Sequence, residues 1–192
     1  MINGFLSVGH TTHFSRKSLD NCLRIAGWEA VESVEQQDYN GLRVLAKPSA
    51  TNTALRAIKT HSTDWKYLVS YLETWYSSLK DAEEKILSLP ESKQFVIWGA
   101  GCHTEFLYQC TSLFSTYVNR MMCLVDSDTM KQGKSWRGLQ VHHPDVLTSI
   151  NWESAILLIS SYGGQKSMRT EAINKKVPEA SIIEIYSYIN KY

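Results

Sequence analysis

The residues with the clearest chemistry lie between Phe95 and Leu107, where the sequence reads Phe-Val-Ile-Trp-Gly-Ala-Gly-Cys-His-Thr-Glu-Phe-Leu. An apolar run enters a turn with two glycines, and the chain leaves that turn on helical spacing. Glycine allows a positive φ and leaves room above a turn, while the amides and dipole of a helix N-terminus attract an anion. We expect a positive φ at both glycines and a phosphate site formed by Gly99, Ala100, Gly101, Cys102, His103 and Thr104.

An acidic residue follows the next apolar run, as it does in dinucleotide-binding folds. Residues 122–125 predict a strand, and Asp126 stands about 25 residues after Gly101, near the position of the acid that binds a ribose in such folds. The Gly-x-Gly-x-x-Thr pattern is weak by itself, because many α/β folds use glycine there only to turn tightly. Both interpretations of the glycines therefore stay open.

Apolar runs alternate with helical patterns from Phe95 onward. A run such as Ala-Ile-Leu-Leu-Ile has no polar alternation, which is typical of parallel strands covered on both faces. We predict an α/β fold in which residues 93–192 form a small Rossmann-like domain with a parallel sheet. The expected strands are 95–98, 121–125, 139–141, 155–159 and 181–185, with helices over 102–114, from Pro144 and between the last two strands.

Side chains suited to a ligand follow the carboxyl ends of these strands, where open α/β sheets bind their ligands. Lys131 and Lys134 come soon after the acidic pair and are within reach of a phosphate, although a solvated lysine loop explains them equally well. The vicinal histidines His142 and His143 point apart, so we assign no metal to them. The predicted crevice collects the glycine turn with Asp126, Asp128, Lys131, Lys134, Ser160, Ser161 and Tyr162.

The first half of the chain predicts smaller elements. Ser15 is placed to cap a helix that runs to Ala26, and residues 28–34 and 42–46 predict a β-hairpin. One helix and two strands bury too little surface for a domain, so residues 1–49 are interpreted as the end of a larger α/β unit. Residues 50–92 predict a helical connector, in which Trp65 and Trp75 pack against neighbouring elements.

Composition limits the partners and the compartment. The 192 residues are 43% apolar and carry a net charge of +1, so no global field attracts nucleic acid or an anionic membrane. The four cysteines form no Cys-x-x-Cys pair, which predicts free thiols in a reducing compartment. No apolar run reaches about 18 residues and no charged-then-apolar leader is present, so we expect a cytoplasmic protein. Cys102 is either a nucleophile at a helix N-terminus or a small residue in a crowded turn.

Two stretches resemble the sugar C-methyltransferase family, whose members use S-adenosylmethionine to methylate nucleotide-linked deoxysugars. Residues 8–15, Val-Gly-His-Thr-Thr-His-Phe-Ser, are similar to the His-Glu-His-x-x-Tyr-Phe-Ser stretch that closes the family's methyltransferase domain. Residues 125–134, Val-Asp-Ser-Asp-Thr-Met-Lys-Gln-Gly-Lys, are similar to the Val-Asp-x-x-x-x-Lys-Gln-Gly-Lys/Arg stretch of its C-terminal domain. The resemblance implies a Rossmann-like C-terminal domain and a catalytic base at His10.

The sequence also departs from the family pattern. The glutamate partner of the family's histidine aligns with Gly9, and a nearby tyrosine aligns with Ser7. His10 is therefore a conditional catalytic residue; the simpler alternative is that it donates a hydrogen bond to a neighbouring carbonyl. The family's Gly-Ala-Pro-Ala-Lys-Gly turn is here Gly-Ala-Gly-Cys-His-Thr, which resembles the Rossmann modules appended to glycan-assembly enzymes. The zinc-binding cysteines and the glycine-rich strand for S-adenosylmethionine have no counterpart.

These features predict the C-terminal part of a methyltransferase-like protein of polysaccharide biosynthesis, binding the nucleotide or phosphate part of a nucleotide-linked sugar. We expect no cofactor in this chain alone, no methylation by it alone, and S-adenosylmethionine only where an upstream methyltransferase domain exists. The expected partners are the sugar nucleotide and such a domain or a second copy of the chain. The alternatives are a non-catalytic docking or scaffold module that uses the tryptophan-rich connector, and an NAD-binding oxidoreductase that rests on Gly99, Gly101 and Asp126.

Overall fold

The computed structural model describes residues 14–34, 42–50 and 64–187. The chain divides into two compact units, Ile2–Leu72 and Glu73–Tyr192. The boundary between them falls inside a helix, whereas the sequence places the start of the second domain at residue 93. The catalytic candidate His10 lies outside the described residues, as do positions 51–63 of the expected connector.

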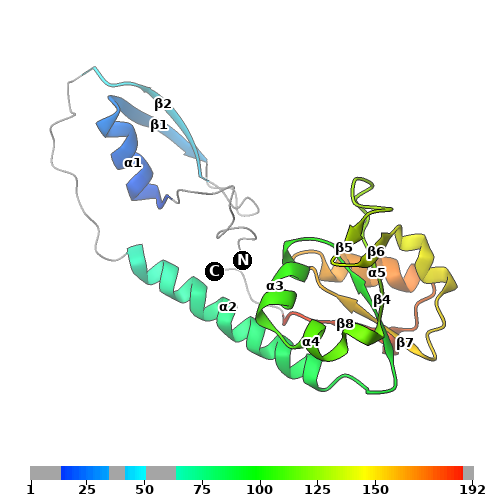
Figure 1. Cartoon of the computed structure of the whole chain (residues 1–192). Coiled ribbons are helices and arrows are strands. Elements are labelled where there is room, and N and C mark those ends of the chain that lie inside the picture. Colours follow the sequence, from blue (N-terminus) through cyan, green and yellow to red (C-terminus); the bar gives the residue numbers. More distant parts are fainter. Residues whose placement is uncertain (1–13, 35–41, 51–63, 188–192) are drawn as a thin grey trace. The chain divides into compact units, whose positions relative to one another are not determined.

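The first unit contains the predicted helix and hairpin (Figure 1). Helix α1 spans Arg16–Ile25, and the Ser15 hydroxyl caps it by accepting a hydrogen bond from the Ser18 amide at 3.2 Å. Strands β1 (Trp28–Val34) and β2 (Arg43–Pro48) pair antiparallel. None of the residues whose side chains are described in 14–50 is buried, as expected for elements too small to enclose a core.

Helix α2 spans Asp64–Leu87 and crosses the boundary between the units. In its second half Ala82 and Ile86 are buried in the core of the second unit, and Trp75 packs against that core. Trp65, in its first half, is 59% exposed. The predicted packing role is therefore confirmed for Trp75 and wrong for Trp65, because the core that the helix covers extends only along its C-terminal turns.

The second unit is built on a mostly parallel six-stranded sheet (Figure 1), which confirms the Rossmann-like α/β prediction. All neighbouring pairs are parallel except the first, in which a two-residue strand that the sequence did not predict forms a short antiparallel edge. The spatial order is β5 (Ser135–Trp136), β6 (Leu139–His142), β4 (Met121–Val125), β3 (Gln94–Trp98), β7 (Ala155–Ile159) and β8 (Ile182–Glu184).

The helix predicted over 102–114 is interrupted. It forms as α3 (Cys102–Cys110) and α4 (Leu113–Tyr117), separated by Thr111 in an extended conformation with φ −133°. The Thr111 hydroxyl bonds to the Leu107 carbonyl, and the Ser112 amide donates to Glu83 of α2 at 2.8 Å. These bonds satisfy the groups that a continuous helix would pair, so the chain turns toward α2.

The remaining helical segments are short. Pro144 begins a 3₁₀ helix, η3 (Pro144–Ser149), where the sequence predicted an α-helix. Helix α5 spans Gln165–Asn174, and two further 3₁₀ turns are η2 (Val118–Arg120) and η4 (Glu179–Ser181). Among the described residues, no helix is long and apolar enough to cross a membrane.

Alternate residues of the central strands enter different cores, so both faces of the sheet are covered. Phe95 and Ile97 of β3 lie in the cluster that contains residues of α2, α3 and α4. Val96 and Trp98 lie in the cluster that contains residues of α5 and η3. The apolar runs without polar alternation follow from this two-sided burial, as predicted.

Candidate functional site

A cavity of about 290 Å³ lies at the carboxyl ends of β3, β4 and β7. In the sheet, β4 lies on one side of β3 and β7 lies on the other. The strand order therefore reverses at β3, and doubly wound sheets bind ligands at such a switch point. The sequence predicted this location. The cavity is lined by Trp98, Gly99, Gly101, Cys102, His103, Thr104, Asp126, Ser127, Lys131, Ser160, Ser161 and Met168.

The two glycines of the turn have different roles. Gly99 has φ +118°, and a Cβ built on it would lie 2.5 Å from the Ser160 Oγ, so both backbone and space require glycine. Gly101 has φ −134°, which any residue adopts, so the predicted positive φ is wrong there. A Cβ on Gly101 would lie 3.7 Å from the Lys131 Nζ. Gly101 therefore leaves space between the turn and an ammonium group.

The N-terminus of α3 faces this space without a cap. Its N-cap residue is Gly101, which has no side chain to bond the first-turn amides. Cys102 and His103 begin the helix and both line the cavity. The positive end of the helix dipole and its free amides thus meet a cavity, which is the geometry that binds an anion.

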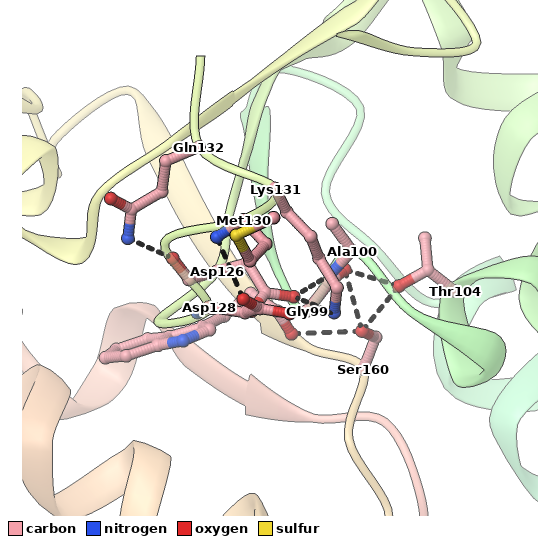
Figure 2. Close-up of polar contacts among 10 residues, drawn as sticks. Gly99, Ala100, Thr104, Asp126, Asp128, Met130, Lys131, Gln132 and Ser160 are labelled. Carbon is pink, nitrogen blue, oxygen red and sulfur yellow. Dashed lines mark hydrogen bonds and ion pairs between the residues drawn. The ribbon is translucent and has the colours of Figure 1, made fainter. Parts of the chain in front are cut away.

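Asp126 fastens the glycine turn to the loop after β4 (Figure 2). Its Oδ2 accepts bonds from the Ala100 amide at 2.8 Å and the Lys131 Nζ at 3.0 Å, and its Oδ1 accepts one from the Asp128 amide at 2.9 Å. Burial by itself raises the pKa of the Asp126 carboxyl, but the bonds from Asp128, Ala100 and Lys131 outweigh burial and lower the pKa. Asp126 is therefore ionised, and both of its oxygens already hold the protein's own donors.

Lys131 is the cation of the site. Its Nζ pairs with Asp126 and lies 3.9 Å from Asp128, and the side chain remains partly exposed toward the cavity. Lys134, predicted beside it, is exposed and does not line the cavity. The two lysines therefore differ. Lys131 lies beside the uncapped helix N-terminus, whereas Lys134 agrees with the interpretation of a solvated lysine loop.

Thr104 and Ser160 hold the glycine turn in place through their hydroxyls (Figure 2). Both are almost fully buried. The Thr104 hydroxyl bonds to the Gly99 carbonyl and lies 2.8 Å from the Ser160 Oγ, which donates to the Trp98 carbonyl at 3.0 Å. Their hydroxyls thus join the ends of β3 and β7, so these two residues position the turn.

His103 lies in the first turn of α3 and lines the cavity. The residue is 8% exposed, and neither ring nitrogen has a hydrogen-bond partner among the described residues. Aromatic rings surround the imidazole, with centroid distances of 5.8 Å to Trp75, 6.2 Å to Phe106, 6.3 Å to Tyr162 and 5.2 Å to Tyr186. Burial lowers the pKa of His103 to about 4, so the imidazole is neutral near pH 7. Burial likewise raises the pKa of the Tyr186 phenol.

The other predicted site residues fall into two groups. Ser161 lines the cavity, and its Oγ accepts a bond from the Gly164 amide at 3.1 Å. Cys102 is exposed at the cavity. Ala100, Asp128, Lys134 and Tyr162 do not line it. The Ala100 amide is bonded to Asp126, Asp128 accepts a bond from the Met130 amide, and Tyr162 packs among the aromatic rings.

Three residues that line the cavity were not predicted from sequence. Trp98 lies next to the glycine turn and Ser127 next to Asp126, so the positions of the motifs were a usable signal for both. Met168 comes from α5. No local pattern marks it, because only the packing of α5 against the sheet brings it to the site.

No metal centre is formed by the described residues, among which no group of three or more His, Cys, Asp or Glu side chains is placed to hold an ion. His143 instead caps η3, where its Nδ1 accepts a bond from the Asp145 amide at 3.2 Å. The cavity thus combines an uncapped helix N-terminus with the Lys131 ammonium and the Asp126 carboxylate that pairs with it. No protein-family model and no curated protein match the chain.

Proposed function

We propose that the Glu73–Tyr192 unit binds the phosphate part of a nucleotide-linked sugar. The observation that carries this proposal is the uncapped N-terminus of α3, which faces the Lys131 ammonium across the space left by Gly101. A phosphate there would receive amide bonds from the helix and a charge-assisted bond from the lysine. The resemblance of residues 125–134 to the sugar C-methyltransferases supports a sugar nucleotide as the ligand.

In this proposal the chain is the C-terminal part of a methyltransferase-like protein of cytoplasmic polysaccharide biosynthesis. The four free cysteines support a reducing compartment. Methyl transfer requires a base and a separately bound donor, and we assign neither to the described residues. S-adenosylmethionine would be held by an upstream methyltransferase domain or a partner chain, and a role of His10 would depend on that domain.

Calorimetry of the full chain with dTDP-, UDP- and GDP-linked sugars tests the binding proposal. Lys131→Gln should weaken binding by about tenfold or more, because it removes a charge-assisted hydrogen bond to phosphate. Lys134→Gln is the matched control: it removes the same charge from the same loop at a residue outside the cavity, and its Kd should stay within about twofold. Equal losses in both variants, or no heat with any of these sugars at millimolar concentration, would refute the proposal.

A docking or scaffold function is the second candidate, and one observation favours it. Helix α2 exposes large apolar side chains at helical spacing: Trp65, Leu68, Val69, Leu72 and Tyr76. Exposed apolar stripes commonly mark interaction surfaces. Light scattering tests this function: a monomer at every concentration, unchanged by Trp65→Ser, would count against self-assembly through α2.

The NAD-binding alternative has less support, because both oxygens of Asp126 already bond to the protein and leave this acid poorly placed to receive a ribose. A titration of NADH fluorescence tests it directly. A saturable change on addition of the chain would revive this alternative.

A further inference from the structure

The turn between β5 and β6 contains an arginine where hairpins rarely have one. Trp136 pairs with Leu139, and Arg137 and Gly138 between them have φ values of +48° and +87°. A two-residue hairpin loop with positive φ at both positions is the pattern of a type I′ turn, in which asparagine or glycine is strongly preferred. Arginine at a positive φ is strained, and such strain persists only where surrounding contacts hold it. The contacts of the Arg137 side chain should therefore account for its presence.

The Arg137 side chain reaches α3. Its Nη2 and Nε donate to Oε1 and Oε2 of Glu105 at 2.6 Å and 3.3 Å, the bidentate geometry that a guanidinium provides and an ammonium does not. Its Cζ lies 3.8 Å from the ring centroid of Tyr108, three residues further along α3, which is a cation–π contact. The hydrogen bond from Arg137 is the largest cause that lowers the pKa of the Glu105 carboxyl, so this acid is ionised. Arg137 thus holds the hairpin to α3 by two contacts.

The preceding residue packs against the same helices. The Trp136 ring lies 5.9 Å from the Tyr108 ring and 5.1 Å from the Phe114 ring of α4, measured between centroids. The contacts of Trp136 and Arg137 with α3 and α4 are called the hairpin clamp below. The hairpin clamp fixes the β5–β6 turn on the helices that follow the glycine turn.

The hairpin clamp and Lys131 belong to one connection, residues 126–138, which joins β4 to β6 and includes β5. At the start of this connection, Asp126 accepts a bond from the Ala100 amide, just before α3. At its end, the hairpin clamp contacts α3 itself. Between them the Lys134 amide donates to the Lys131 carbonyl at 3.1 Å. The connection is therefore attached to the α3 segment on both sides of Lys131, and both attachments limit how far its ammonium moves from the helix N-terminus.

We propose that Arg137 is a positioning residue of the anion site: through Glu105 and Tyr108 it keeps the connection that carries Lys131 in place beside the α3 N-terminus. The proposal rests on the proposed function and deepens it, because it assigns the relative position of the two halves of the site to a residue that does not line the cavity. Arg137 touches no ligand. It keeps the binding-competent arrangement populated, and a site that is competent for only part of the time binds with proportionally lower affinity.

Arg137→Asn separates positioning from folding. Asparagine suits the positive φ of the turn, so this variant should melt at or above the wild-type temperature although it loses both contacts with α3. Calorimetry of the full chain with pyrophosphate should show a Kd about threefold to tenfold weaker than that of the wild-type chain. Arg137→Lys retains the charge but neither the bidentate pair nor the planar group over Tyr108, so its Kd should lie between the two.

Two further variants separate the hairpin clamp from charge. Arg169→Asn is the matched control, because it removes the same charge and a partly exposed ion pair with Glu179 from α5. Its pyrophosphate Kd should stay within about twofold of the wild-type value. Tyr108→Leu removes the ring beneath Arg137 without changing any charge, and it should weaken pyrophosphate binding as well. In the double variant with Arg137→Asn the two losses should not add, because both break the same contact.

The proposal is overturned if Arg137→Asn binds pyrophosphate as tightly as the wild-type chain, or if Arg169→Asn loses as much affinity, which would reveal an effect of net charge alone. A lower melting temperature together with weaker binding in Arg137→Asn would assign Arg137 to folding and would also overturn it. In each of these cases a loss of pyrophosphate binding in Lys131→Gln would still support the phosphate site. Absence of pyrophosphate binding to the wild-type chain would instead refute the proposed function, and the positioning role with it.

Discussion

Two neighbouring regions of the second unit differ in how their polar groups are satisfied. In the glycine turn and the loop after β4, the carboxylate of Asp126 and the hydroxyls of Thr104 and Ser160 all bond to the protein. In the aromatic cluster around His103, the imidazole is buried and neither nitrogen has a hydrogen-bond partner among the described residues. The first region therefore has its shape fixed by internal bonds, whereas the second contains a buried polar group without such bonds.

This difference predicts two kinds of effect on stability. Substitutions in the bonded region should act mainly on folding, because they leave buried groups unpaired or force atoms together. Substitutions at His103 should act mainly on the pH dependence of stability. Three measurements test this difference.

The largest effect is expected at the glycine turn. Gly99→Ala places a Cβ 2.5 Å from the Ser160 Oγ at a φ of +118°, so we expect a loss of about 2–4 kcal/mol of unfolding free energy. Gly101→Ala is the matched control, because its φ is −134° and its nearest contact is the flexible end of Lys131 at 3.7 Å. Gly101→Ala should lower the unfolding free energy by less than about 1 kcal/mol and should weaken anion binding. Urea denaturation measures both; similar losses would contradict the distinction between the glycines.

The next effect is the pH dependence contributed by His103. Its pKa is lowered from 6.5 to about 4 by burial, so between these values the unfolded chain binds a proton that the folded chain does not. The unfolding free energy is therefore unaffected by this group above pH 6.5 and falls as the pH is lowered toward 4, by up to about 3 kcal/mol. Urea denaturation from pH 7 to 4.5 should show the loss in the wild-type chain and a smaller one in His103→Phe. If the unfolding free energy had the same slope against pH in both chains, the imidazole would be exposed to water and not buried.

The smallest of the three effects is expected at Asp126. Asp126→Ala removes the acceptor of the Ala100 and Asp128 amides and the partner of Lys131, which should cost about 1.5–3 kcal/mol. Asp128→Asn is the control: its side chain is exposed, its amide oxygen can still accept the Met130 amide, and stability should change by less than about 0.5 kcal/mol. A thermal melt compares the two, and a neutral Asp126→Ala would show that the turn holds without this link.

Much of the second unit was predictable because its signals are local. Five apolar runs marked five of the six sheet strands, and β7 agrees with its predicted bounds, since strands buried on both faces need continuous apolar sequence. The two-residue strand β5 was missed because it is too short to show a pattern. The break between α3 and α4 was missed because it depends on Glu83 of α2, which is distant in sequence and bonds to the Ser112 amide.

The sequence alone determined the alternation of strands and helices, the glycine turn at residues 99–101 and the edge of the sheet at which polar residues gather, because periodicity and glycine placement are properties of neighbouring residues. Which of those residues face the cavity depends on the packing of the folded chain. It placed Lys131 there and Lys134 outside, used Asp126 as a brace, and buried His103 beside Trp75. These outcomes depend on contacts between elements far apart in the chain, where burial and hydrogen-bond competition determine the role of each side chain.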